Sequence, residues 1–131
     1  MHKLFAVGAF TAALALASGA AAAPGAGQAA DHSCFFVTQW RGWSAPSDDV
    51  LYLAVNRDVY RVDLAGRAYG LHTPGRFLVS KVRGSSSICS AVDLDLAVAD
   101  TTGYSTPLFA RSLRRLTPDE VAAIPAKDRP R

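Results

Sequence analysis

The fold of this chain is decided by residues 50–64, VLYLAVNRDVYRVDL. Two apolar runs, residues 50–55 and 59–64, flank a short polar turn, which is the pattern of a β-hairpin. In the second run the apolar residues alternate with Arg61 and Asp63, so the apolar side chains share one face of the strand. The first run is apolar on both faces, which predicts a central position in its sheet.

Runs of similar composition predict further strands on both sides of this hairpin, at residues 34–40, 76–83, 93–98 and 108–113. The segments between the predicted strands are rich in glycine, proline and short polar residues, and they predict turns or loops at residues 41–49, 66–75, 84–87 and 100–106.

Two of these strands have a definite facing pattern. In residues 76–83, Phe77, Val79 and Lys81 are expected to share one face. In residues 93–98 the expected inward side chains are Leu94, Leu96 and Val98, and the expected outward ones are Asp93, Asp95 and Ala97.

The chain ends in a short helix signal around residues 116–124. Thr117 can cap the helix, Pro118 suits its first position, and Glu120 completes a capping box. A helix of two turns is unstable alone, so its apolar side chains, those of Leu116, Val121 and Ile124, must dock on the sheet. The predicted fold is therefore mainly β: a small antiparallel sandwich or partly open barrel of about six strands with one short C-terminal helix.

The first 23 residues have the layout of a secretory signal peptide. A cationic start, Met1 to Lys3, precedes an apolar run over residues 4–17 and a stretch of small residues over 18–23. Cleavage is expected after Ala22 or Ala23, with a later site near Ala29 as the alternative. The mature protein is therefore expected to be periplasmic or secreted.

Two other interpretations of this segment fit less well. A membrane-spanning helix needs about 20 apolar residues, and this run is shorter and interrupted by Gly8 and Thr11. A lipid anchor on Cys34 would need small and apolar residues before that cysteine, where Asp31, His32 and Ser33 stand. We therefore expect no lipid anchor.

The remaining chain has the length of one domain. We expect a flexible mature N-terminus at residues 24–33, a single β-rich domain at 34–125 and a C-terminal tail at 126–131. The whole chain carries 14 Lys and Arg against 11 Asp and Glu, and removal of Lys3 with the leader leaves a net charge of +2. That balance argues against a nucleic-acid partner, because nucleic-acid binders carry clustered cations.

Cys34 and Cys89 are the two cysteines of the chain. In an oxidising compartment such a pair indicates a disulfide. The alternatives are two separate buried thiols or a nucleophilic cysteine, which would need a neighbouring base or cation to lower its pKa.

Four short motifs resemble a known family of small exported proteobacterial proteins, domain-of-unknown-function family 6491. The motifs are Cys34-Phe35, residues 87–96, Thr106-Pro107-Leu108 and residues 116–120, and the resemblance runs from about Cys34 to Pro125. Family members commonly carry two more cysteines, at the positions of Ala68 and Leu108. Their joint absence here implies that those two form a pair, which leaves Cys34 with Cys89. The family implies no activity, substrate or cofactor.

Several polar and aromatic groups can be considered as sites, and none carries a catalytic motif. Asp93, Asp95 and Asp100 are too few ligands for calcium, so no metal or cofactor is expected. The serines around Cys89 lack a nucleophile-elbow motif. Trp40 and Trp43 either pack in the core or stack on a partner.

Three arginines near the end of the last strand, Arg111, Arg114 and Arg115, form either a solvated strand edge or an anion site. With Trp40 and Trp43, Arg111 and Arg115 are the candidate partner contacts.

The sequence favours a non-catalytic binding or structural module of the cell envelope, whose partner would be a protein or another envelope component. One alternative is a small secreted hydrolase or thiol enzyme, which needs His32 or His72 within reach of a serine or cysteine. Another is an inhibitor of a secreted enzyme. The sequence does not predict the oligomeric state.

Overall fold

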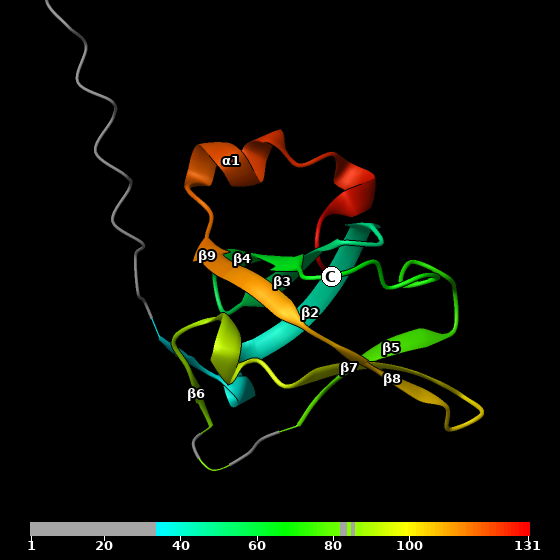
Figure 1. Ribbon diagram of the computed structural model, residues 1–131. Helices are drawn as coiled ribbons and strands as arrows, with labels where there is room; N and C mark the ends of the chain where they lie inside the picture. The colour runs from blue at the N-terminus through cyan, green and yellow to red at the C-terminus, as the bar shows by residue number, and fades with distance from the viewer. Residues whose placement is uncertain (1–33, 82–83, 85) are drawn as a thin grey trace, which may run out of the picture.

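A computed structural model of the protein describes residues 34–81, 84 and 86–131. The predicted signal peptide, residues 1–23, and the predicted flexible segment, residues 24–33, lie outside the described residues. In the described part the chain is mainly β, with antiparallel sheets and one short C-terminal helix (Figure 1), which confirms the predicted fold class.

The predicted hairpin is present as β3 (Val50–Val55) and β4 (Asp58–Leu64). Its turn is the two-residue link Asn56–Arg57, and Asn56 has a positive φ of 53°, a conformation that asparagine tolerates better than most residues. Tyr60, Val62 and Leu64 are buried as predicted. β3 also lies inside its sheet, between β2 and β4, which confirms its predicted central position.

β2 (Trp40–Ser47) and β9 (Ala110–Arg115) complete a four-stranded sheet in the order β2-β3-β4-β9. The prediction of a turn at residues 41–49 was wrong, because most of that segment is β2. Register shifts between Trp40 and Gly42 and between Ser44 and Ser47 accommodate its glycine and proline, and β2 is an edge strand, where proline is tolerated.

A second sheet has the order β5-β7-β8, made of β5 (Arg76–Ser80), β7 (Leu96–Asp100) and β8 (Ser105–Leu108). The strand predicted at 93–98 begins only at Leu96, because the preceding 3₁₀ turn η2 (Ala91–Asp93) uses Asp93 as a hydrogen-bond acceptor. Part of the loop predicted at 100–106 belongs to β8.

The strand predicted at 108–113 is divided between the two sheets. Phe109 is the link at which the chain leaves β8 and enters β9 (Figure 1). The predicted strand 34–40 is also divided, into β1 (Phe35–Phe36), the 3₁₀ turn η1 (Val37–Gln39) and the start of β2. β1 pairs with β6 (Ser87–Ile88) in a two-stranded sheet. These two divisions, together with β6, which was not predicted, account for nine described strands where about six were expected.

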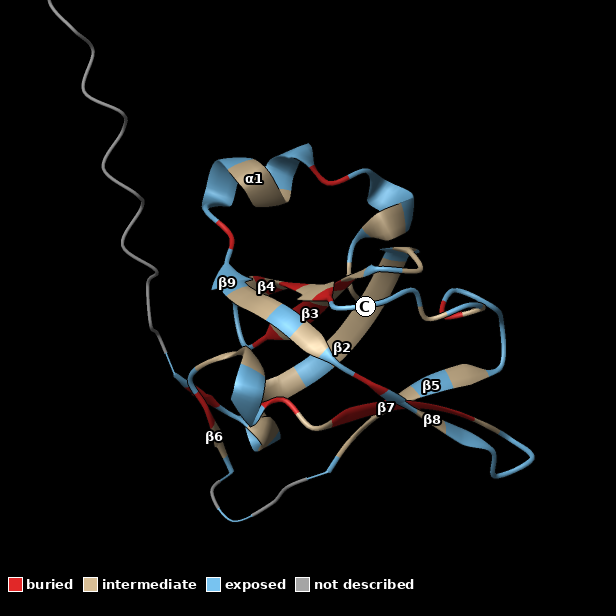
Figure 2. Cartoon of the chain, in the orientation of Figure 1, coloured by how far each residue is buried: buried red, intermediate tan, exposed pale blue. Residues whose placement is uncertain are grey.

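The main core lies between the sheets and draws on all three of them (Figure 2). Its largest fully buried side chains are those of four leucines and one valine: Leu51, Leu53, Leu71, Leu96 and Val62. The ring of Phe35 from β1 lies 4.8 Å from that of Tyr60 in β4, measured between centroids, so the two-stranded sheet packs directly on the hairpin.

Ala97 was expected to point outward into water, and this expectation of exposure was wrong. Its side chain does lie on the face opposite to Leu96 and Val98, yet it is 1% exposed. The reason is its size, because Ala97 stands between the larger residues Val79 and Pro107 of the flanking strands.

The C-terminal segment lies on the other side of the four-stranded sheet from β6 (Figure 1). It consists of α1 (Pro118–Ala123) and the 3₁₀ turn η3 (Ala126–Asp128). Leu116 and Ile124 are buried there, separate from the main core. Residues 126–131, expected as a tail, contact β2: the Ser44 hydroxyl donates to the Asp128 carbonyl, and a Cβ on Gly42 would overlap the Arg131 carbonyl.

The predicted capping box of α1 is present. The Glu120 N–H donates to the Thr117 hydroxyl at 3.3 Å, and the Thr117 N–H donates to the Glu120 carboxylate at 2.8 Å. Arg114 also donates to Glu120, and the Thr117 and Arg114 contacts lower the pKa of this carboxyl. The cap therefore connects the end of β9 to the helix.

Replacing Thr117 by Ala removes the hydroxyl acceptor and should lower the free energy of unfolding by about 1 kcal/mol. The measurement is chemical denaturation of the mature protein. Thr117→Ser is the matched control, since it keeps the acceptor and should retain most of the stability. An unchanged midpoint for Thr117→Ala would show that the cap contributes nothing to the fold.

Candidate functional site

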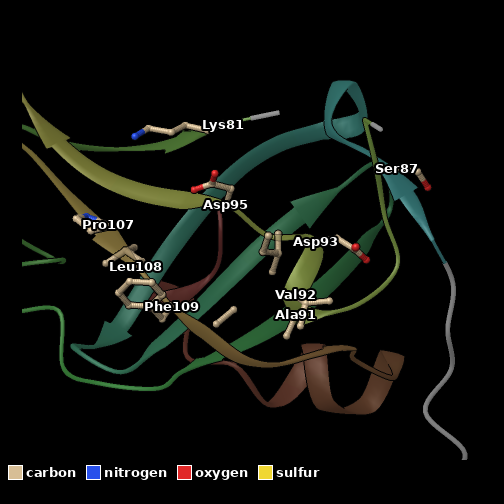
Figure 3. Close-up of a pocket in the computed structure, with 11 residues that line it drawn as sticks. Lys81, Ser87, Ala91, Val92, Asp93, Asp95, Pro107, Leu108 and Phe109 are labelled. Carbon is tan, nitrogen blue, oxygen red and sulfur yellow. The ribbon is translucent and has the colours of Figure 1, made fainter. Parts of the chain in front are cut away.

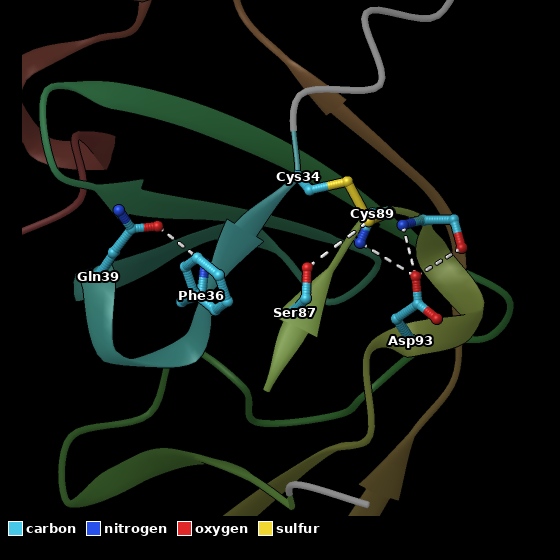
Figure 4. The surroundings of a disulfide bond; sticks show 7 residues. Cys34, Phe36, Gln39, Ser87, Cys89 and Asp93 are labelled. Atoms are coloured by element: carbon cyan, nitrogen blue, oxygen red, sulfur yellow. Dashed lines mark hydrogen bonds between the residues drawn. A yellow bond between two sulfur atoms is a disulfide. The ribbon is translucent and has the colours of Figure 1, made fainter. Parts of the chain in front are cut away.

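The bonded cysteines organise the surroundings of β1 and β6 (Figure 4). Cys34 and Cys89 form a disulfide with their α-carbons 4.2 Å apart, which confirms the predicted pair. The next residues pair directly, Phe35 with Ile88, and both side chains are buried. The bridge therefore holds the first described residue beside a strand more than 50 residues later in the chain.

Asp93 fixes the turn that follows the disulfide. Its carboxylate accepts hydrogen bonds from the N–H groups of Cys89 and Ser90 and from the Ser90 hydroxyl, at 2.8 to 3.0 Å. These bonds, the Cys89 N–H first, lower the pKa of Asp93. The carboxylate thus has a structural task in the turn.

The other two carboxylates considered as metal ligands, Asp95 and Asp100, do not form a metal site with Asp93. Asp100 accepts from Thr102 and from the Tyr104 N–H, and these bonds, led by the Thr102 hydroxyl, lower its pKa. Within the described residues no group of three His, Cys, Asp or Glu side chains is placed to hold a metal ion.

The groups needed for nucleophilic chemistry are not brought together in the described part of the chain. Both sulfur atoms are in the disulfide, so no thiol is free. His72 lies with Nδ1 3.4 Å from an oxygen of Asp48, and no hydrogen bond links it to a described serine. His32 lies outside the described residues.

The two tryptophans are partly buried and pack against the core. Residues three apart in a regular strand point to opposite faces, yet Trp40 pairs with Val55 and Trp43 with Leu53, both on the core side. The bulge at Arg41 supplies the extra residue that turns both indoles to the same face. The Trp40 indole N–H donates to the Gly42 carbonyl at 2.7 Å, within the same bulge.

The three arginines of β9 do not form one cluster with a shared orientation. Arg111 donates to the Leu64 carbonyl at 3.0 Å, Arg114 pairs with Glu120 on the outer side, and Arg115 lies 3.9 Å from Asp58. Arg114 stands opposite Arg61, whereas Arg115 stands opposite the buried Tyr60. Each arginine therefore has a different neighbour.

One apolar surface of the described chain was not singled out from the sequence. One face of β5-β7-β8 packs on the core through Leu78, Leu96, Val98 and Leu108. By strand alternation the other face carries five apolar residues, Phe77 and Val79 from β5, Ala97 and Ala99 from β7, and Pro107 from β8. No other described helix or strand makes an extensive contact with this face, and Phe77 is 45% exposed.

This surface continues into a groove between β8 and η2 (Figure 3). Pro107 and Phe109 lie on the β8 side of the groove, and Ala91 and Val92 on the η2 side. Phe109 is 70% exposed and Val92 is 91% exposed. We call the five sheet residues together with Phe109, Ala91 and Val92 the outer apolar face.

The alternation in residues 76–83 placed Phe77 and Val79 on one side of their strand, without assigning that side to the core or to the surface. What the sequence did not show is the outward position of Phe109, because it depends on the chain leaving one sheet for another at that residue.

Comparison of the chain with family models, with curated proteins and with solved structures found no match. Among the described residues no helix combines the length and the hydropathy that a membrane crossing requires.

The disulfide should contribute up to about 4 kcal/mol to the free energy of unfolding, because it closes a long loop in the unfolded chain. Chemical denaturation with and without reductant measures this contribution. The double variant Cys34→Ala/Cys89→Ala is the control, and its midpoint should be low and insensitive to reductant. Alkylation of the denatured, unreduced protein that labels two thiols per chain would contradict the bond.

Proposed function

We propose that this protein is an exported, non-catalytic binding module of the cell envelope, and that it binds its partner through the outer apolar face. The observation that carries the proposal is the exposure of three large apolar side chains on this face, those of Phe77, Val92 and Phe109. Exposure of neighbouring apolar side chains to water is unfavourable, and exposed apolar patches often mark sites of protein interaction.

Two observations support an envelope location. The first 23 residues have the order of charge, apolar run and small residues that export signals share. The Cys34–Cys89 bond is of the kind that persists in oxidising compartments such as the periplasm. Periplasmic or secreted localisation is part of this proposal.

The dimensions of the face favour a short apolar segment of another protein over a second copy of this chain. Three strands about 4.8 Å apart, with up to five residues of about 3.3 Å each, give the sheet part of this face an area of about 240 Å². A stable interface usually buries about 800 Å² on each partner. The partner is therefore a single helix or extended strand, bound reversibly.

The alanines of β7 add little to this face, because Ala97 and Ala99 are 1% and 6% exposed between the taller side chains of β5 and β8. A partner segment would therefore meet Phe77, Val92 and Phe109.

The resemblance to domain-of-unknown-function family 6491 is likewise proposed. It accounts for the joint occurrence of Cys34 and Cys89 without the cysteines expected at Ala68 and Leu108. Both of these positions pack in or against the core, so apolar residues there stabilise the fold without a second bridge.

Export can be tested by the intact mass of the protein produced in a native-like host. The soluble extracytoplasmic protein should lack about the first 22 or 23 residues, as expected for signal-peptide cleavage. Recovery of the full-length mass with Met1 in the soluble fraction would contradict export.

Partner binding can be tested by capture from an envelope extract with the oxidised mature domain as bait. Val92→Asp and Phe109→Ser should abolish retention of the partner, because each places a polar group in the apolar face. Tyr69→Ser is the matched control, since Tyr69 is 76% exposed and lies outside the face. A partner retained equally by all variants would place the contact elsewhere, and the absence of any specific partner would contradict the binding function.

A further inference from the structure

The structure describes ten arginines, and they differ in whether their side chains contact another group of the protein. This difference indicates a second site. Seven of them contact a carboxylate, a backbone carbonyl or an aromatic ring: Arg61, Arg67, Arg76, Arg111, Arg114, Arg115 and Arg129. Within the described residues, Arg41, Arg57 and Arg131 have no such contact. Two of these three, Arg41 and Arg57, line one open pocket together with Asn56 and Asp58.

The fold brings Arg41 and Arg57 together from two different features. Arg41 is the extra residue of the first bulge in β2, and Arg57 belongs to the turn between β3 and β4. The Asn56 N–H donates to the Gln39 carbonyl at 3.0 Å, which ties the turn to the chain just before the bulge. The two arginines therefore belong to the same end of the four-stranded sheet and line the same pocket.

The charge balance of this pocket is positive. Asp58 is the acidic residue that lines it, and Arg115 lies 3.9 Å from the Asp58 carboxylate and offsets its charge. An anion in this pocket can interact with the positive charges of both arginines. Guanidinium groups also match the geometry of phosphate and carboxylate oxygens.

We propose that Arg41 and Arg57 form a binding site for a phosphate group. A phosphate carries up to two negative charges and several acceptor oxygens, so it can engage both arginines together. The shared chemistry fits the headgroup of an anionic phospholipid and a free phosphate compound alike. The site belongs to the opposite part of the fold from the outer apolar face, since it is built on β2, β3 and β4 rather than β5, β7 and β8.

The test is a titration of the oxidised mature domain with inorganic phosphate at low ionic strength, followed by amide chemical shifts. Saturable changes should be confined to residues 39–42 and 55–58. Arg41→Gln and Arg57→Gln should each weaken binding by about tenfold, as expected for loss of a charge-assisted hydrogen bond. Asp58→Asn should strengthen binding, because it removes the negative charge of the pocket.

Arg67→Gln is the matched control, since it removes the same charge at a distant loop and should leave binding nearly unchanged. Sedimentation with phosphatidylglycerol vesicles, against phosphatidylcholine vesicles, then separates the sources of phosphate. Arginine-dependent sedimentation with phosphatidylglycerol assigns the site to a lipid headgroup, and phosphate binding without sedimentation assigns it to a soluble compound. Failure of both probes to bind, or equal weakening by Arg67→Gln, would overturn the site.

Discussion

The pairing of β3 with β4 is the contact on which the rest of the structure depends. Leu51 stands opposite Val62 and Leu53 opposite Tyr60, and these four side chains form one apolar surface that is almost completely buried. Phe35 of β1 packs directly on Tyr60, and the same core cluster includes Leu96 and Val98 of the second sheet, with the two tryptophans of β2 packed against it. A one-residue slip of this register would turn the buried side chains into water, so the register is strongly fixed.

The two ends of the described chain are held by different means because they meet different faces of that sheet. At the start, Cys34 is exposed and β1 has only two residues, so its pairing with β6 alone would be weak, and the covalent bond to Cys89 compensates. At the end, α1 is too short to persist alone and relies on Leu116, Ile124 and the cap. The residues after it reach β2, where only a glycine at position 42 leaves room for the Arg131 carbonyl.

The sequence predicted those parts of the fold that depend on local alternation and composition. The hairpin, the facing of Tyr60 and Val62, the cap of α1 and the cysteine pair all follow from residue types at short spacing or from simple counting. The bulges of β2 were missed, because Gly42 and Pro46 favour a turn locally, and only the pairing with β3 keeps them in a strand. The division of the last strand at Phe109 was missed for the same reason. It depends on long-range pairing, because the residues before Phe109 pair with β7 and the residues after it pair with β4.

These misses have a consequence for function, because both proposed surfaces arise where the chain departs from regular geometry. The bulge that turns Trp40 and Trp43 into the core also leaves Arg41 as the extra residue beside the β3–β4 turn. The transfer of the chain between sheets at Phe109 leaves that aromatic side chain in water next to η2. The hairpin core and the disulfide stabilise the fold independently of both places, so the protein can keep the apolar side chains of the first proposed surface exposed.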